Sequence, residues 1–339
     1  MHQDAEALAW QFLLAARKVL SVVAQGNDFL SYSSDTGQVC QTEQMVETTC
    51  LWLDDTGCWR YKPDLPALLQ ASFDLYLPIV GNRAVDRFIT AHLGQSIDAR
   101  IATSCGDSFY VTGEENRKHL HCLRALSDAV IVGYGTIVSD DPQLTTRAVP
   151  GANPVRVLID PHARLQAPMK VFNDGQARTV LIHQSSADLT GLDMHFGPAI
   201  EIRKGQVSSQ VERWIVPGSG DSLSIHNIVE LLYERGLRRL FIEGGGVTVS
   251  RFFEACLLDR LHMAIAPLLV GEGVGALQID GVKKMIDAHR PPHTTYRMGD
   301  DILWDFDVSA MKYGRSIGAE NPVSEARQVL QSPSLERIR

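Results

Sequence analysis

The chain has 339 residues, of which 45% are apolar and 21% are charged, and its net charge is −8. This length suits about two domains, and the composition is typical of globular proteins with a sizeable core. The negative charge excludes a general nucleic-acid surface, because such surfaces need clustered Lys and Arg to neutralise phosphates. No stretch approaches the roughly 18 uncharged apolar residues of a membrane span, and acids precede the first apolar run, so we expect a cytoplasmic protein without a secretory signal.

Cysteine and histidine spacing argues against a metal site. The six cysteines, at positions 40, 50, 58, 105, 122 and 256, form no C-x-x-C pair, which favours reduced thiols over a disulfide framework or zinc. His119 and His121 stand two apart in an expected helix, so their side chains point to different sides. We therefore expect no bound metal.

Residues 1–82 are expected to form a small accessory region of unknown function. Apolar residues recur at helical spacing over 5–25, and Gly26 follows as a stop signal. Strand-like runs, CLWLDD and CWRYK, alternate with turn signals over residues 28–80. A proline-punctuated segment then leads to the second region.

Strands alternate with helices over residues 83–311, which predicts an α/β fold with parallel pairing. The expected strands cover 87–93, 129–135, 155–160, 179–184, 239–245 and 260–271. The expected helices cover 224–236 and 247–257, and Thr112-Gly-Glu-Glu115 forms a capping box for a helix through Leu126. Residues 312–339 are polar without a clear period, which predicts a mobile tail.

Residues 92–147 have the character of a site for a phosphorylated small molecule. Arg124 lies near the inward stripe of its helix, where a cation needs an anionic partner from the protein or a ligand. Arg147 follows a turn in which Asp140 and Asp141 most simply cap backbone N–H groups. Two arginines in such a setting suit a phosphate.

The run Glu243-Gly-Gly-Gly246 lies between a buried strand and a helix. Glycines there let a ligand approach the backbone, and the N–H groups at a helix start attract phosphate. Side chains of Thr248, Ser250 and Arg251 could add donors. A tight strand-to-helix turn without any ligand explains the same glycines equally well. The run is not the G-x-G-x-x-G dinucleotide fingerprint.

At these residues the sequence resembles a known family, the reductase domain of the riboflavin-biosynthesis deaminase/reductase. The resemblance runs from about residue 88 to 309 in ordered blocks. The matching motifs are Ser96-Ile-Asp98, Ala102-Thr-x-x-Gly106-Asp-Ser108, Tyr110-Val-Thr112, Leu123-Arg124-Ala125, Gly135-Thr136, Asp140-Asp-Pro-x-Leu-Thr-x-Arg147, Asn153-Pro-Val-Arg-Val, Phe241-Ile-Glu-Gly-Gly, Phe252-Phe-Glu-Ala, Asp259-x-Leu-His and Ile265-Ala-Pro.

The resemblance implies a dihydrofolate-reductase-like α/β fold, with a mixed and mostly parallel sheet flanked by helices, and a homodimer. It also implies NADPH as hydride donor and a phosphoribosylamino-pyrimidine as substrate, whose opened ribose accepts hydride at C1. The substrate contacts that carry over are Ser108, Arg124, Leu144, Arg147, Glu243 and His92. Glu243 is also the implied catalytic residue, which would orient the ribose or shuttle a proton. The cofactor contacts that carry over are Gly94, Tyr110, Thr136, Asp140, Gly245, Gly246, Val247, Thr248, Val249, Ser250 and Arg251.

Two positions depart from the family pattern: His92 stands where lysine is usual, and Ala99 stands where glycine is usual. Residues 1–90 also lack H-x-E and P-C-x-x-C, which a zinc deaminase needs, so we expect reduction without deamination. The choice of NADPH over NADH rests on the resemblance, with Ser185 and Ser186 as candidates to meet a 2′-phosphate.

Three functions therefore stay open. The leading hypothesis is reduction of 5-amino-6-(5-phosphoribosylamino)uracil in riboflavin biosynthesis. The two departures and the accessory region favour a reductase of the same fold that acts on another pyrimidine or a pterin. The third possibility is a non-catalytic nucleotide-binding protein.

Overall fold

The computed structural model describes residues 2–21, 29–33, 36–42, 44–82, 87–109, 111–165, 168–184, 211–216, 218–219 and 222–313. The chain divides into two compact units, the first reaching Phe88 and the second beginning at Ile89. Within the described ranges no helix is long and apolar enough to cross a membrane. The expected tail, 312–339, lies outside the described residues from position 314 onward.

The first unit combines two helices with a small antiparallel sheet. Its elements are α1 (His2–Ser21), β1 (Phe29–Ser33), β2 (Gln38–Thr42), β3 (Thr49–Leu53), β4 (Trp59–Tyr61) and α2 (Ala67–Val80), with strand order β2-β1-β3-β4. The helices pack through an edge-on contact between Phe12 and Phe73, whose ring centroids are 5.9 Å apart. Helix α2 was not expected from its prolines. Pro66 directly precedes the helix and Pro78 lies in its last turn, where one lost hydrogen bond is tolerated.

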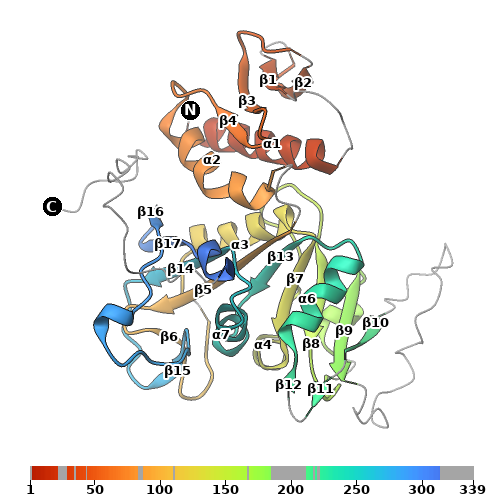
Figure 1. Ribbon diagram of the computed structural model, residues 1–339, viewed down its shortest axis with the longest axis vertical. Coiled ribbons are helices and arrows are strands. Elements are labelled where there is room, and N and C mark those ends of the chain that lie inside the picture. The colour runs from red at the N-terminus through yellow and green to blue at the C-terminus, as the bar shows by residue number, and fades with distance from the viewer. Residues whose placement is uncertain are drawn as a thin grey trace. The chain divides into compact units, whose positions relative to one another are not determined.

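The second unit is built on a nine-stranded mixed sheet, in the order β10-β9-β8-β7-β13-β5-β14-β17-β16 (Figure 1). Its strands are β5 (Phe88–Ser96), β7 (Ala129–Gly133), β8 (Val155–Ile159), β9 (Thr179–Gln184), β10 (Val211–Val216), β13 (Arg239–Glu243), β14 (Arg260–Ala266), β16 (His293–Met298) and β17 (Asp301–Asp307). Strands β10, β9, β8, β7 and β13 run parallel, as do β5 and β14, whereas β17 and β16 are antiparallel. The expected mixed and mostly parallel α/β sheet is confirmed.

Helices cover both faces of this sheet. Successive strand residues point to opposite sides, so each strand contributes side chains to both layers. Its helices are α3 (Glu114–Leu126), α4 (Tyr134–Asp140), α5 (Lys170–Asn173), α6 (Ile225–Glu234) and α7 (Gly246–Glu254). Ile89 and Leu93 of β5 join a core cluster with apolar residues of α6 and α7. His92, between them in β5, bonds Asn116 of α3 on the opposite face.

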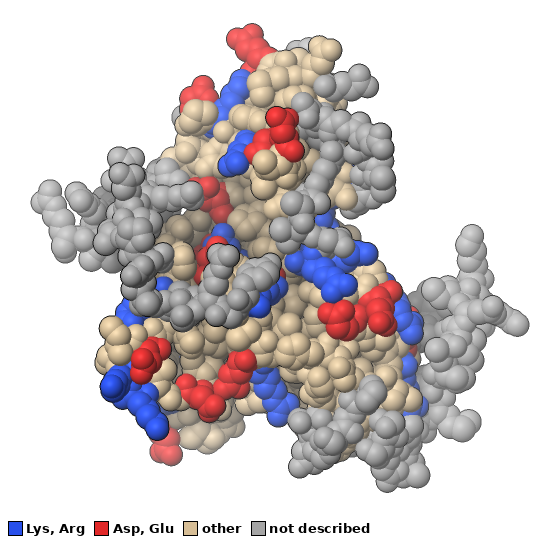
Figure 2. All heavy atoms as spheres, in the orientation of Figure 1, with Lys and Arg blue, Asp and Glu red and all other residues tan. Residues whose placement is uncertain are grey.

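Shorter elements complete the second unit. They are β6 (Arg100–Thr103), β11 (Gly218–Ser219), β12 (Ser222–Leu223), β15 (Gly273–Gly275) and the 3-10 turns η1 (Met285–Asp287) and η2 (Ser309–Tyr313). Strand β6 pairs with β15, and β11 with β12. Acidic and basic side chains are interspersed among the described residues on the face drawn in Figure 2.

The expected strands and helices are confirmed, with ends shifted by a few residues, but the capping box is wrong. Helix α3 begins after Gly113, which makes no side-chain cap. The Gly113 amide instead donates to Oδ2 of Asp301, far along the chain, at 2.7 Å. The Thr112 hydroxyl accepts from the Asn116 side chain at 2.9 Å. The contact between Gly113 and Asp301 thus replaces the local cap.

Candidate functional site

Two strand-to-helix turns meet at the carboxyl ends of β7 and β13. A Cβ on Gly133, which ends β7, would lie 2.4 Å from Oγ1 of Thr248 in α7. A Cβ on Gly245, before α7, would lie 2.7 Å from Oγ1 of Thr136 in α4. Each turn therefore needs a glycine because a threonine of the other helix occupies the space.

The first turn of α7 divides into exposed and inward-facing residues. Gly246 packs against backbone, since a Cβ there would lie 2.0 Å from the carbonyl oxygen of Ala276. Val249 is buried in the core cluster. The Ser250 hydroxyl donates to the Gly246 carbonyl at 2.6 Å and accepts from the Gln278 amide at 2.7 Å. Of the sequence-predicted cofactor residues here, Val247 and Arg251 are the exposed ones.

One face of α3 is directed at the candidate site. Arg117, His121 and Arg124 recur at helical spacing, so they lie along the same side of the helix. Arg117 lines a pocket, whereas His121 and Arg124 contact the turn that follows α4. The sequence did not single out Arg117, and it raised His121 only as a candidate metal ligand, although their spacing from Arg124 carries the signal.

Arg124 and Glu243 form an ion pair through two parallel bonds. Nε of Arg124 donates to Oε2 of Glu243 at 2.7 Å, and Nη2 bonds Oε1. Both side chains are largely buried, with 7% and 13% of their surface exposed. Nη1 of Arg124 donates to the Thr145 carbonyl at 2.9 Å. The anionic partner that the sequence required for Arg124 is therefore a protein carboxylate.

Arg147 lies beside this pair with an exposed side chain. Its Nη1 is 3.4 Å from Oγ1 of Thr145, and its amide donates to Nδ1 of His121 at 3.2 Å. Burial, and then the positive charge of Arg124, lowers the pKa of Arg147, although Glu243 opposes this effect. An anion bound here would relieve the repulsion between the two guanidinium groups.

His121 is held neutral by its burial and by the same charges. Burial is the largest cause that lowers its pKa to about 4, followed by the positive charges of Arg124 and Arg147. Because Nδ1 accepts from the Arg147 amide, the proton of the neutral ring is assigned to Nε2. The ring therefore acts as an acceptor that fixes the Arg147 backbone.

A pocket of about 340 Å³ is lined by Ser108, Phe109, Arg117 and Asp140. The Ser108 hydroxyl donates to Oδ1 of Asp140 at 2.9 Å, which joins the polar turn before α3 to the end of α4. Phe109 is 76% exposed beside them. Two sequence-predicted residues, one for substrate and one for cofactor, are thus brought together.

Histidine side chains lie between the opposite face of α3 and the sheet. His92 is buried, and its Nε2 lies 3.0 Å from Oδ1 of Asn116. Nε2 of His119 lies 3.0 Å from Nδ1 of His262, and Nε2 of His262 lies 3.2 Å from Oδ1 of Asp305. Burial is the main cause that lowers the pKa of His92 to about 4 and that of His119 well below its ordinary value. These rings pack between α3 and the sheet.

The remaining sequence-predicted residues lie in the interior or outside the described residues. Gly94 faces α3, where a Cβ would lie 2.7 Å from Cγ2 of Thr112. Leu144 is 1% exposed, so its side chain points into the interior. Tyr110, Ser185 and Ser186 lie outside the described residues. Over the described ranges, no three His, Cys, Asp or Glu side chains gather as a metal site would require.

Known proteins share this architecture and its motifs. The family model of the RibD C-terminal domain matches residues 87–302. The chain belongs to this family. The 2,5-diamino-6-ribosylamino-4(3H)-pyrimidinone 5′-phosphate reductase of Methanothermobacter thermautotrophicus is 31% identical over 227 residues, which cover 65% of this chain and 98% of that protein.

A longer relative and a solved structure show the same similarity. Riboflavin biosynthesis protein RibD of Aquifex aeolicus is 30% identical over 219 residues, which cover 64% of this chain and 56% of that protein. The chain thus spans little more than half of that relative. The crystal structure of a Thermotoga maritima deaminase/reductase superposes with a TM-score of 0.51 at 24% identity, over 70% of this chain and 61% of that one. This superposition shows the shared fold.

Proposed function

We propose that this protein reduces a phosphorylated ribosylamino-pyrimidine of riboflavin biosynthesis with a nicotinamide cofactor, NADPH. The observation that carries the proposal is the group formed by Arg124, Glu243 and Arg147. It places a fixed carboxylate and an exposed guanidinium side by side, which suits a sugar phosphate. Membership of the RibD C-terminal domain family supports the reaction class.

The residues at the ends of β7 and β13 fit a nicotinamide dinucleotide. Glycines at 244 and 245 have φ of 72° and 73°, and a Cβ on Gly244 would meet only Cγ2 of Thr136, at 3.9 Å, so the backbone there is open to a ligand. Val247 in the first turn of α7 is exposed, which favours a diphosphate at this helix start, and Asp140 would hold the cofactor near Ser108. When bound, the cofactor supplies a hydride.

The residues of this chain would then orient the ribose. Opening of the sugar breaks its C1–O bond: the amino nitrogen on C1 gives up a proton and forms a C=N bond, and the ring oxygen gains a proton. C1 of this imine would then accept the hydride, and the nitrogen would take up a proton from solvent. Arg147 would bind the phosphate and so fix the chain end of the sugar. Both oxygens of Glu243 already accept from Arg124, so the carboxylate is held as an acceptor for a ribose hydroxyl. This geometry favours orientation by Glu243.

The deciding experiment follows NADPH oxidation with 5-amino-6-(5-phosphoribosylamino)uracil, and with NADH in a parallel reaction. We expect turnover with NADPH and a much higher KM for NADH. No oxidation with either cofactor at saturating substrate would overturn the proposal. Replacement of the phosphorylated substrate by its dephosphorylated form tests the assigned role of Arg147 in the same assay.

A second candidate substrate is the diamino-pyrimidinone that has not been deaminated. The Methanothermobacter relative, named for that substrate, aligns over 98% of its length, so it matches this chain as a reductase alone. A competition assay with both pyrimidines would rank their kcat/KM values. Preference for a pterin, or binding without turnover, would favour the remaining alternatives.

We also propose a homodimer, on the basis of the family resemblance, and an accessory role for the region up to residue 82. Light scattering of the full chain measures the first. Comparison of kcat/KM between the full chain and a variant lacking that region would test the second.

A further inference from the structure

The turn Asp141–Arg147 has a strained backbone. Asp141 and Leu144 have φ of 41° and 55°, in the left-handed region that side chains other than glycine rarely adopt. Such a conformation persists only when surrounding contacts hold it in place. The turn carries Leu144 and Arg147, both expected at the substrate, so the contacts that hold it bear on function.

Nζ of Lys170 donates to the Asp141 carbonyl at 3.2 Å, and four further described contacts hold the backbone of this turn from Gln143 to Arg147. Two carbonyls of the turn accept: that of Gln143 from Nη1 of Arg156 at 3.1 Å, and that of Thr145 from Nη1 of Arg124 at 2.9 Å. Two amides donate: that of Thr146 to Oδ1 of Asn153 at 2.7 Å, and that of Arg147 to Nδ1 of His121 at 3.2 Å. The contact from Arg156 falls directly before Leu144, where the left-handed conformation must be imposed.

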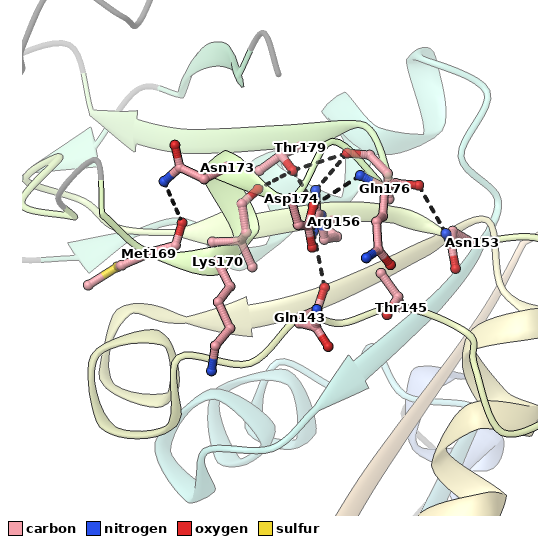
Figure 3. Close-up of polar contacts among 12 residues, drawn as sticks. Gln143, Thr145, Asn153, Arg156, Met169, Lys170, Asn173, Asp174, Gln176 and Thr179 are labelled. Carbon is pink, nitrogen blue, oxygen red and sulfur yellow. Dashed lines mark hydrogen bonds and ion pairs between the residues drawn. The ribbon is translucent and has the colours of Figure 1, made fainter. Parts of the chain in front are cut away.

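Arg156 is fully buried in β8, and its guanidinium bonds acceptors on every side (Figure 3). Nε donates to Oγ1 of Thr179 at 2.9 Å, and Nη2 donates to the Ala177 carbonyl at 2.7 Å. Nη1 reaches both oxygens of Asp174, at 2.8 and 2.7 Å, besides the Gln143 carbonyl. Burial raises the pKa of Asp174, but the hydrogen bond and charge of Arg156 bring it below its ordinary value.

A buried arginine is costly, and an apolar residue of similar volume often serves stability as well or better. An apolar side chain could fill the space beneath the turn, but it could not donate to the Gln143 carbonyl. The fork geometry of a guanidinium lets one side chain bond the turn, Asp174 and β9 together. The function that arginine alone can perform here is therefore to fix the turn.

We propose that Arg156, anchored by Asp174, is a positioning residue that sets the turn Asp141–Arg147 for binding of the substrate phosphate. The inference rests on the proposed function for its kinetic consequence, but the positioning itself is measurable without substrate. Arg156 acts through Gln143 and does not touch the substrate.

The kinetic test compares Arg156→Lys and Asp174→Asn with the wild-type chain. We expect each variant to raise KM for the phosphorylated pyrimidine about tenfold, since a charged hydrogen bond is lost, while kcat and KM for NADPH change by less than about twofold. The effect should vanish with the dephosphorylated substrate. Gln143→Ala is the matched control, because Arg156 bonds the main chain of that residue and not its side chain. If the wild type is active, variants that lose only kcat, or whose KM for the phosphorylated pyrimidine equals that of the wild type, would overturn the inference.

Hydrogen–deuterium exchange separates this inference from the proposed function. We expect the amides of Thr146 and Arg147 to exchange about tenfold faster in both variants, while the amides of β7 and β13 stay unchanged. If the wild type reduces no pyrimidine, the proposed function fails and local acceleration at this turn still supports the positioning. Uniform acceleration, or none, overturns it. Asp174→Asn retains an oxygen acceptor and decides the matter if Arg156→Lys does not fold.

Discussion

Arg124 and Glu243 are 119 positions apart in sequence, yet their side chains meet through two parallel bonds at the candidate site. The guanidinium of Arg124 is therefore already matched to a carboxylate, and its remaining Nη1 bonds Thr145. Arg147, which is exposed beside them, is the cation that we propose for a substrate phosphate. The two arginines that looked alike in the sequence have different surroundings.

Arg147→Ala should raise KM for the phosphorylated pyrimidine by about ten- to a hundredfold, because charge-assisted bonds to the phosphate are lost. Initial rates of NADPH oxidation at varied substrate measure this change. Arg290→Ala, at an exposed arginine, is the matched control and should leave KM unchanged. An equal loss with the dephosphorylated substrate would contradict the assignment of the phosphate to Arg147.

Glu243→Met should lower the free energy of unfolding by about 3 kcal/mol, since it leaves the guanidinium of Arg124 largely buried without its carboxylate. Arg124→Met should have a similar effect for the opposite charge. The double variant should lose less than the sum of the two single losses, because no uncompensated charge remains. Urea denaturation of the four proteins measures this coupling, and strictly additive losses would rule out a coupled pair.

Ala99→Gly should raise the free energy of unfolding by about 1 kcal/mol. Ala99 has φ of 61° in the turn between β5 and β6, where a left-handed alanine costs about 1–2 kcal/mol. Glycine removes this cost, but the greater entropy of its unfolded chain cancels part of the gain in stability. Ala148→Gly, at an exposed alanine outside the left-handed region, should be neutral or destabilising. Thermal unfolding of both variants provides the comparison, and equal effects at the two positions would be inconsistent with strain at Ala99.

Stability should fall as the pH drops from about 6.5 toward 4, partly through His92. Burial, with the nearby His262, lowers the pKa of His92 to about 4 in the folded protein, whereas an unfolded histidine titrates near 6.5. Between these values the unfolded chain binds the proton and the folded protein does not, so the stabilisation is complete above 6.5 and is lost toward 4. One such group accounts for roughly 3 kcal/mol.

The variant His92→Gln tests this origin of the pH dependence. Its free energy of unfolding, measured with urea at about pH 7 and about pH 4, should fall less between the two conditions than that of the wild type. His226→Gln is the control, because that histidine is exposed. A pH dependence identical in the wild type and His92→Gln would show that His92 does not carry the effect.

The sequence predicted the sheet of the second unit well, because its buried strands are apolar runs bounded by turn residues. It did not predict α2, whose prolines mimic a loop, or the β16–β17 hairpin, which packs at the antiparallel edge. Long-range contacts explain the errors at α3, where Asp301 replaces the local cap. Periodicity and local turn signals carry no information about such partners.

The same limit applies to the candidate site. The motifs brought Ser108, Asp140 and Glu243 to attention, but no local pattern pairs Glu243 with Arg124 across the fold. The departure at Ala99 looked like a difference in ligand, but the φ of 61° there shows that the usual glycine suits the backbone of the turn. The roles of Thr145 and His121 depend on main-chain contacts that the residue types do not announce.

The crossed contacts between the β7 and β13 turns have a consequence for how this fold can diverge. Gly133 faces Thr248, and Gly245 faces Thr136, so each helix start fills the space that the other turn leaves open. A side chain at position 133 becomes possible once the opposing threonine shifts or shrinks, so positions 133 and 248 should change together during evolution. Gly245 has φ of 73°, a conformation that side chains rarely adopt, so glycine should persist there whatever replaces Thr136.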